Sequence, residues 1–158
     1  MQINSLRFGP MEIPDDHVIT MERPILGFEN LSDFCLIEKD ELLPFLWMQS
    51  LEEPAVAFLV VNPHVFYPRY RIEINPNEIS ELRVVKVENV ETYVIVNVPE
   101  DPRQISANLQ GPILINTENN LAKQLVLVNS EYQVRHNILE ACESMRQTAT
   151  RREQPVGV

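Results

Sequence analysis

The stretch from Val94 to Asn119 constrains the fold of this chain more than any other segment. An apolar run ends at Pro99, a polar connection follows, and Gly111 and Pro112 open a second apolar run. Proline fixes φ and lacks an N–H donor, whereas glycine permits a bend, so the path of this connection is tightly restricted. The stretch therefore predicts two buried strands joined by an ordered polar excursion.

Short apolar runs bounded by Gly, Pro and Asn recur along the rest of the chain, which is typical of β-strands. We expect strands near residues 3–8, 11–13, 17–21, 34–37, 45–50, 55–61, 70–74, 84–87, 90–98, 113–115 and 121–128. Asn75 and Pro76 predict the start of a short helix, because Asn is a good N-cap and Pro suits the first helical position.

The apolar spacing becomes helical after Ile138, which predicts a weak amphipathic helix that reaches Ala149 and fades over 151–155. Many short strands with little helix predict a mainly β fold, a small antiparallel β-barrel-like domain or a sandwich with short helices. We place the β domain at residues 1–139 and the helix and its tail at 140–158.

The charge balance is strongly acidic, with 13 basic and 23 acidic side chains and a net charge of −10. This balance argues against direct binding to nucleic acid, because phosphate contacts need clustered Lys and Arg, and it favours a basic partner. Residues 29–53 hold seven acids and one lysine, a net charge of −6. These acids are either solvated loop ends or a binding face, and the sequence leaves both interpretations open.

The longest apolar run, from Ala55 to Val61, is far shorter than the roughly 20 residues that a membrane helix needs. The N-terminus lacks a basic-then-apolar signal pattern. We therefore expect no membrane association and a cytoplasmic location.

The side chains that carry chemistry do not converge in any recognised motif. His17, His64 and His136 each lack a second ligand at helical or hairpin spacing, and neither Cys35 nor Cys142 belongs to a zinc or disulfide pattern. No Gly-x-Ser-x-Gly elbow occurs, and four glycines cannot form a phosphate loop. We expect no catalytic residue, no metal and no cofactor. A pair of carboxylates from distant segments stays open, so the alternative is a small-ligand-binding β-barrel or a carboxylate-based hydrolase.

Aromatic residues gather in the loop from Pro63 to Tyr70, which is too short to bury all of them by itself. Tyr70, Ile72 and Ile74 alternate with polar residues, which predicts a strand that shows Glu73 to solvent. The single tryptophan, Trp47, is either a core residue or an interface anchor.

Eight short motifs, each weak alone, occur in order and together resemble the flagellar assembly factor FliW family. They are Gly27-Phe28, Phe45-Leu46-Trp47-Met48-Gln49-Ser50, Ala57-Phe58, Asn62-Pro63, Phe66-Tyr67-Pro68 followed by Tyr70, Val98-Pro99-Glu100-Asp101-Pro102, Ala107-Asn108-Leu109 and Gly111-Pro112-Ile113-Leu114-Ile115-Asn116. The resemblance ends near Arg135-His136 and leaves the tail outside.

The resemblance implies a compact β-barrel-like domain that acts as a switch and not as an enzyme. Proteins of this family bind flagellin in the cytoplasm and also bind CsrA, an RNA-binding repressor of flagellin translation, so that sequestering CsrA relieves the repression. We expect two groups of protein-binding residues, without assigning a partner to either. The first is Phe66, Tyr67, Tyr70 and Glu73, and the second is Glu100, Asp101, Asn108 and Leu109.

Overall fold

A computed structural model describes residues 1–128 and 130–153, with side chains described up to residue 147. Its elements, in chain order, are β1 (Gln2–Ser5), β2 (Gly9–Glu12), η1 (Asp15–His17), β3 (Ile19–Arg23), β4 (Asp33–Ile37), η2 (Asp40–Leu42), β5 (Leu46–Ser50), β6 (Ala57–Val61), η3 (Pro63–Val65), α1 (Pro76–Ser80), η4 (Val87–Asn89), β7 (Val90–Asn97), η5 (Pro102–Gln104), β8 (Ser106–Ala107), β9 (Ile113–Asn116), β10 (Leu121–Gln124), β11 (His136–Asn137) and α2 (Ile138–Glu153).

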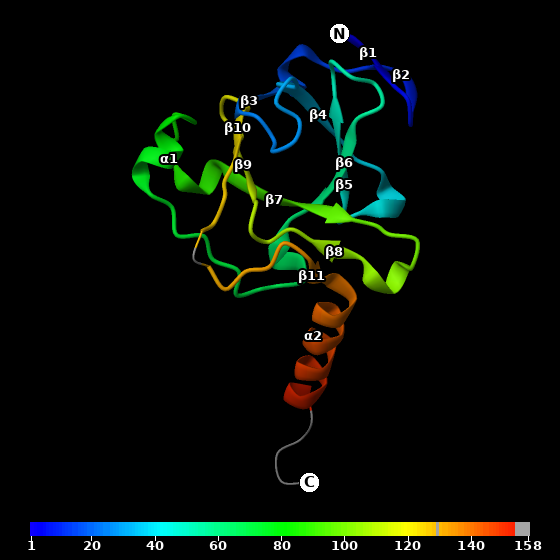
Figure 1. Cartoon of the computed structure of the whole chain (residues 1–158), viewed down its shortest axis with the longest axis vertical. Coiled ribbons are helices and arrows are strands. Elements are labelled where there is room, and N and C mark those ends of the chain that lie inside the picture. Colours follow the sequence, from blue (N-terminus) through cyan, green and yellow to red (C-terminus); the bar gives the residue numbers. More distant parts are fainter. Residues whose placement is uncertain (129, 154–158) are drawn as a thin grey trace.

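One sheet closes on itself and forms a barrel from β3, β4, β5, β6, β7, β9 and β10 (Figure 1). β7 closes the ring, because its first half pairs with β9 and its second half with β6. The pairing of β3 with β10 is parallel, and the other pairings around the ring are antiparallel. β8 and β11 extend the sheet beyond the barrel, and β1 and β2 form a separate hairpin. The predicted β-barrel class is confirmed.

Side chains fill the interior of the barrel. Phe34, Met48, Val60 and Ile113 are all fully buried there, on strands that lie far apart in the sequence. A second apolar cluster, which we call the outer cluster, forms where the segments after β6 and β10 pack on the outside of β6, β7 and β8. It comprises Val61, Phe66, Tyr70, Val94, Val96, Ala107, Leu109 and Ile138. The two clusters use alternate residues of β7, as the period of a strand requires.

Two predicted strands are absent. Residues 70–74 alternate between buried and exposed, but they form a connection without a strand, because Arg71 donates its backbone N–H to the hydroxyl of Tyr132 and not to a neighbouring strand. Residues 84–87 form a turn that enters η4. The predicted start of α1 is confirmed, with the Oδ1 of Asn75 accepting the N–H of Asn77 at 3.0 Å.

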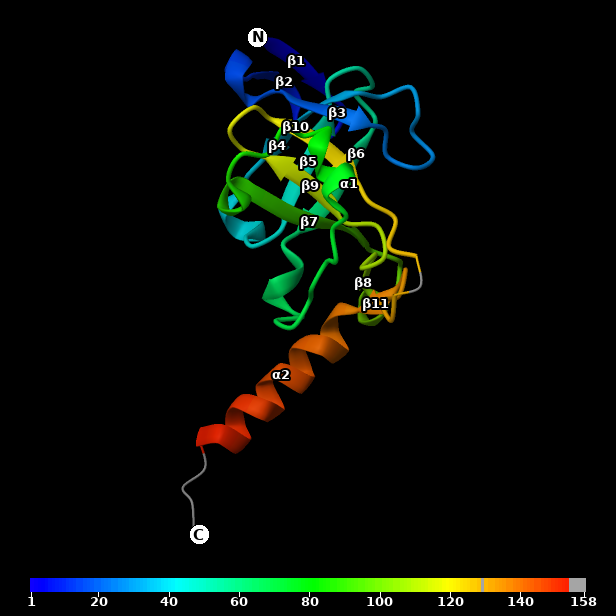
Figure 2. The ribbon, with the colours of Figure 1, turned by 90° about the vertical axis from the view of Figure 1, so that its left-hand side faces the viewer.

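α2 projects away from the barrel as a single helix (Figures 1 and 2). The side chain of Asn137 caps it by accepting the N–H of Glu140 at 2.9 Å, and Ile138 anchors it in the outer cluster. The helix extends to Glu153 and is longer than predicted. The last part of the predicted helix and tail, residues 154–158, lies outside the described residues. None of the helices in the described part of the chain is both long and apolar enough to cross a membrane.

Candidate functional site

The aromatic segment after β6 folds back on the barrel and is mostly buried. Phe66 and Tyr70 are each 2% exposed, and both pack in the outer cluster. η3 positions them: Asn62 caps this turn by accepting the N–H of His64 at 2.9 Å. The ring of His64 is held in turn against the backbone oxygen of Tyr70 at 2.9 Å.

The hydroxyl of Tyr70 donates a hydrogen bond to the backbone oxygen of Leu109 at 2.6 Å. Leu109 is 1% exposed, and burial raises the pKa of the Tyr70 hydroxyl. We expected Phe66, Tyr70 and Leu109 to present a contact surface, and their burial contradicts that expectation. The sequence indicates an aromatic loop, but it does not show that residues of β7 and β8 cover that loop. These three side chains are therefore core residues beneath the surface.

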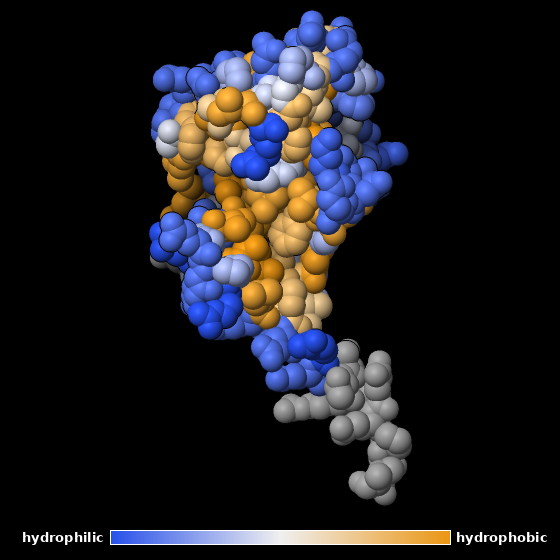
Figure 3. Space-filling model, turned by 90° about the vertical axis from the view of Figure 1, so that its right-hand side faces the viewer, coloured by the Kyte–Doolittle hydropathy of each residue, from blue (hydrophilic) through white to orange (hydrophobic). Residues whose placement is uncertain are grey.

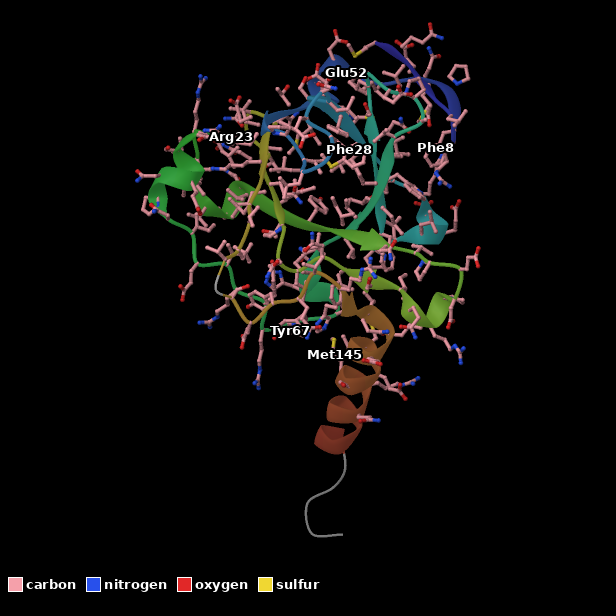
Figure 4. The ribbon with its side chains drawn as sticks, in the orientation of Figure 1. Phe8, Arg23, Phe28, Glu52, Tyr67 and Met145 are labelled. Atoms are coloured by element: carbon pink, nitrogen blue, oxygen red, sulfur yellow. The ribbon has the colours of Figure 1, made fainter. Side chains whose placement is uncertain are left out.

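Tyr67 is half-buried and lies at the base of α2 (Figure 4). Its ring makes edge contacts with the rings of Tyr132 and His136, with centroid separations of 5.8 and 5.3 Å. Burial lowers the pKa of His136, and the nearby carboxylate of Glu140 acts in the opposite direction. The structure therefore joins Tyr67 to two residues beyond position 130 that the sequence did not connect with it.

The predicted acidic residues lie at the surface. Glu73 is exposed and makes no hydrogen bond or ion pair with the residues that the structure describes. Glu100 is also exposed. Asp101 caps η5 and pairs with the Nε of Arg103 at 3.1 Å, and this bond lowers the pKa of the Asp101 carboxyl. Asp101 is therefore at least partly structural.

Asn108 is half-buried, and its Oδ1 accepts the N–H of Gln110 at 3.1 Å. Its amide nitrogen lies beside Gly111, where a Cβ atom would come within 2.9 Å of it. Gly111 is therefore needed for space, whereas the sequence indicated a need for a bend. Of the second predicted group, Leu109 belongs to the outer cluster and Asn108 precedes it in the chain, whereas Glu100 and Asp101 lie on the η5 loop.

An apolar band runs along the outside of the barrel toward α2 (Figure 3). Some members of the band are partly buried and pack on the outer cluster. The others are exposed apolar residues. Val98 is the first residue after β7; it is 57% exposed and continues the alternation of Val94 and Val96 along the chain. The apolar band consists of Leu42, Leu43, Phe45, Leu59, Val98 and Ile105.

Acidic turns border the apolar band on both sides, where Figure 3 shows hydrophilic surface. The turn at η2 carries Glu38, Asp40 and Glu41, and the loop at η5 carries Glu100. These four side chains are exposed and make no ion pair among the described residues. Apolar surface bordered by unpaired carboxylates is complementary to a protein segment that has an apolar stripe and basic flanks.

Part of the acidic segment 29–53 has a structural role. The Oε1 of Glu52 accepts the N–H groups of Asp33 and Ser32 at 2.7 and 2.8 Å, and these bonds lower the pKa of its carboxyl.

Trp47 is partly a core residue and partly a surface residue, because its side chain is half-buried. Its ring packs edge-on with the ring of Phe8 at a centroid separation of 6.3 Å, and the guanidinium of Arg7 lies over it, 4.0 Å from its centroid.

Catalytic geometry does not emerge from the described side chains. The carboxyl groups with a perturbed pKa are Glu52, Glu81 and Asp101, and each is lowered by a hydrogen bond or ion pair, the opposite of what a general acid needs. Within the described residues, no group of three or more His, Cys, Asp and Glu is placed to hold a metal ion. The filled barrel interior also disfavours an enclosed ligand cavity.

Sequence reasoning missed most of the apolar band. Leu42, Leu43 and Ile105 come from loops, whose apolar side chains carry no periodic signal. Val98 did carry a periodic signal, because it continues the alternation of Val94 and Val96 one step past the end of β7.

The fold defines a small closed β-barrel with a filled interior and one projecting helix. Known proteins share it: a crystal structure of the flagellar assembly factor FliW superposes with a TM-score of 0.81 at 31% identity, covering 87% of this chain and 96% of that chain. The sequence also matches the FliW protein family over residues 2–138.

Curated relatives agree with this match. The flagellar assembly factor FliW of Thermoanaerobacter pseudethanolicus is 42% identical over 89% of this chain and 94% of its own length. That of Syntrophus aciditrophicus is 39% identical over 89% of each chain. The chain therefore belongs to the FliW family of flagellar assembly factors.

Proposed function

We propose that this protein is a cytoplasmic, non-enzymatic switch that binds flagellin and the translational regulator CsrA in turn. Free of flagellin, it sequesters CsrA and so relieves the repression of flagellin synthesis. Membership of a family of flagellar assembly factors supports this role. The acid-bordered apolar band is the observation that carries the protein-binding part of the proposal.

The band offers what a protein interface needs. Apolar side chains such as Phe45 and Val98 supply area that gains free energy when it leaves water, at roughly 25 cal/mol per Å². The carboxylates around it steer a basic partner to the surface and speed its association. A net charge of −10 also repels the phosphates of any RNA bound to that partner.

The experiment compares two valines that are both exposed. Val98, at 57% exposure, lies in the apolar band, and Val85, at 81% exposure, lies in the turn before η4. We expect Val98→Lys to weaken the affinity for flagellin or CsrA about tenfold or more, because a charge then enters the buried part of the interface. Val85→Lys should stay within about twofold of wild type.

Titration calorimetry with each purified partner gives the two affinities, and circular dichroism confirms that both variants are folded. Equal affinities for Val98→Lys and wild type toward both partners would remove the apolar band from the proposal.

A further inference from the structure

A pocket of about 310 Å³ opens at the mouth of the barrel, apart from the apolar band. The loop between β3 and β4 forms one wall, the ends of β6, β7 and β8 form the floor, and the segment before β11 closes the other side. Figure 4 shows Phe28 on the loop that makes the first wall. Gln124 fixes this loop, because its Oε1 accepts the N–H of Leu26 at 2.9 Å while its Nε2 donates to the backbone oxygen of Gly111 at 3.0 Å.

The floor of the pocket and the adjoining part of its first wall are apolar. Phe28 and Phe58 meet edge-on at a centroid separation of 4.8 Å, and Ile95 lies beside them on β7. All three side chains are only half-buried, so they retain surface that faces the pocket. A volume of about 310 Å³ is near the lower limit for small-molecule sites and is large enough for one apolar side chain of a partner.

The rim carries polar groups that the fold does not use. Asn97 and Ser106 are register partners on β7 and β8, so their side chains lie next to each other on the same face. Ser106 is 5% exposed, yet neither its hydroxyl nor the amide of Asn97 bonds to any described residue. No buried side-chain nitrogen or oxygen among the described residues lacks a partner, so the unbonded Ser106 hydroxyl is in contact with solvent, and Ser106 lines the pocket.

Arg135 is the one charged residue among those that line the pocket. It is exposed and forms no ion pair or hydrogen bond with the part of the chain that the structure describes. The amide nitrogen of Asn108, which also lines the pocket, donates to none of the described residues either. The side chains of Asn97, Ser106, Asn108 and Arg135 thus offer unused hydrogen-bond donors around the apolar part of the pocket. This local preference for an acceptor contrasts with the net charge of −10 of the whole protein.

We propose that this pocket holds an apolar side chain from a partner protein segment in which a carboxylate stands next to that side chain. The apolar side chain packs on Phe28, Phe58 and Ile95, and the carboxylate accepts hydrogen bonds from Arg135. Asn97, Ser106 and Asn108 donate to the carboxylate or to the adjoining peptide oxygens. The exposed Leu26 and Val134 extend the apolar surface at the rim, which suits a protein segment better than a free small molecule.

This charge preference is opposite to that of the apolar band, which favours basic flanks. The pocket therefore favours segments that carry a carboxylate over segments that carry basic residues, whichever protein the segment belongs to. Its failure in the test below would leave the proposed binding of flagellin and CsrA untouched, because the test uses neither protein.

The test uses a tetrapeptide, Gly-Leu-Asp-Gly, blocked at both ends, and the ¹⁵N NMR spectrum of the full chain. We expect a Kd on the order of 1 mM, with shifts concentrated at the amides of Ser106 and Asn108. Replacing the peptide's Leu by Ala should abolish binding, and replacing its Asp by Asn should weaken it about five- to tenfold.

Arg135→Gln should weaken the Asp peptide about five- to tenfold and leave the Asn peptide unchanged, because the two substitutions remove the same ion pair. Lys86→Gln, which removes an equal charge at the opposite end of β7, is the matched control and should bind like wild type. N-acetyl-leucine serves as the small-molecule arm and should bind more weakly than the tetrapeptide. The proposal is overturned if about 10 mM tetrapeptide produces no shifts at the pocket, if Arg135→Gln binds both peptides like wild type, or if N-acetyl-leucine binds more tightly than the tetrapeptide.

Discussion

The hydroxyl of Tyr70 and the backbone oxygen of Leu109 are joined by a buried hydrogen bond of 2.6 Å between residues 39 positions apart. This bond ties the aromatic segment after β6 to the polar excursion between β7 and β9. Both sides of the outer cluster are thereby fixed under the surface that we assign to partner binding.

Tyr70→Phe removes the donor and leaves the backbone oxygen of Leu109 without this bond. We expect the free energy of unfolding to fall by about 1 to 3 kcal/mol, the usual cost of an unsatisfied buried polar group. For a chain of 158 residues this corresponds to a decrease in Tm of roughly 2 to 12 °C. Tyr67→Phe is the control, because the Tyr67 hydroxyl makes no hydrogen bond with the described residues. Equal thermal unfolding of the two variants would contradict a stabilising role for the bond.

His136 makes stability depend on pH at the base of α2. Burial lowers its pKa in the folded state from 6.5, so the folded state binds this proton less readily than the unfolded state. The stabilisation is present above pH 6.5 and is lost as the pH falls through the folded pKa. We expect Tm to decrease between pH 8 and pH 5, and His136→Phe to decrease less.

The exposed His17 provides the control, since His17→Gln should keep the wild-type response to pH. If His136→Phe instead shows the full wild-type loss of Tm, other groups cause the pH dependence.

Gly111→Ala tests the close packing behind the barrel-mouth pocket. A Cβ atom at this position would approach the amide nitrogens of both Asn108 and Gln124 to 2.9 Å. The amide of Gln124 cannot move away without losing its bonds to Leu26 and to residue 111. We expect a loss of about 1 to 3 kcal/mol by urea denaturation. The loss should shrink in a Gln124→Ala background, and equal losses in both backgrounds would contradict the proposed collision.

Glu73→Lys separates binding from stability. The carboxylate is exposed and unpaired among the described residues, so reversing its charge should change the free energy of unfolding by less than about 0.5 kcal/mol. If Glu73 belongs to the binding surface, the affinity for a basic partner should decrease. Thermal unfolding and titration calorimetry give the two quantities. A variant that unfolds would show a structural role, and a folded variant with wild-type affinity would place Glu73 outside the binding surface.

Most of the barrel could be predicted from the sequence because its strands carry local signals. The turn chemistry at Gly111 and Pro112 and the alternation along β7 are readable without any tertiary contact. Residues 70–74 show the limit of this approach. Their alternation reports correctly which side chains are buried, but it cannot show that the hydroxyl of Tyr132 takes the backbone hydrogen bond that a strand would need.

The candidate site was harder to predict, because exposure depends on which distant segment covers a residue. Phe66 and Tyr70 carry the aromatic signal of an interface, yet most of the residues that bury them lie much further along the chain, on β7 and β8 and at the start of α2. Conversely, the unused hydrogen-bonding groups of Ser106 and Arg135 become visible only when the donors and acceptors around them are known.

On the proposed function, this protein binds CsrA and flagellin one at a time. The most direct measurement is size-exclusion chromatography of the protein with CsrA and of the same mixture after flagellin is added. We predict co-elution with CsrA at low salt and displacement of CsrA by flagellin, and in stopped-flow mixing CsrA should associate more slowly as the salt concentration rises. Failure to co-elute with either protein at low salt, or one stable complex that contains all three, would contradict the claim.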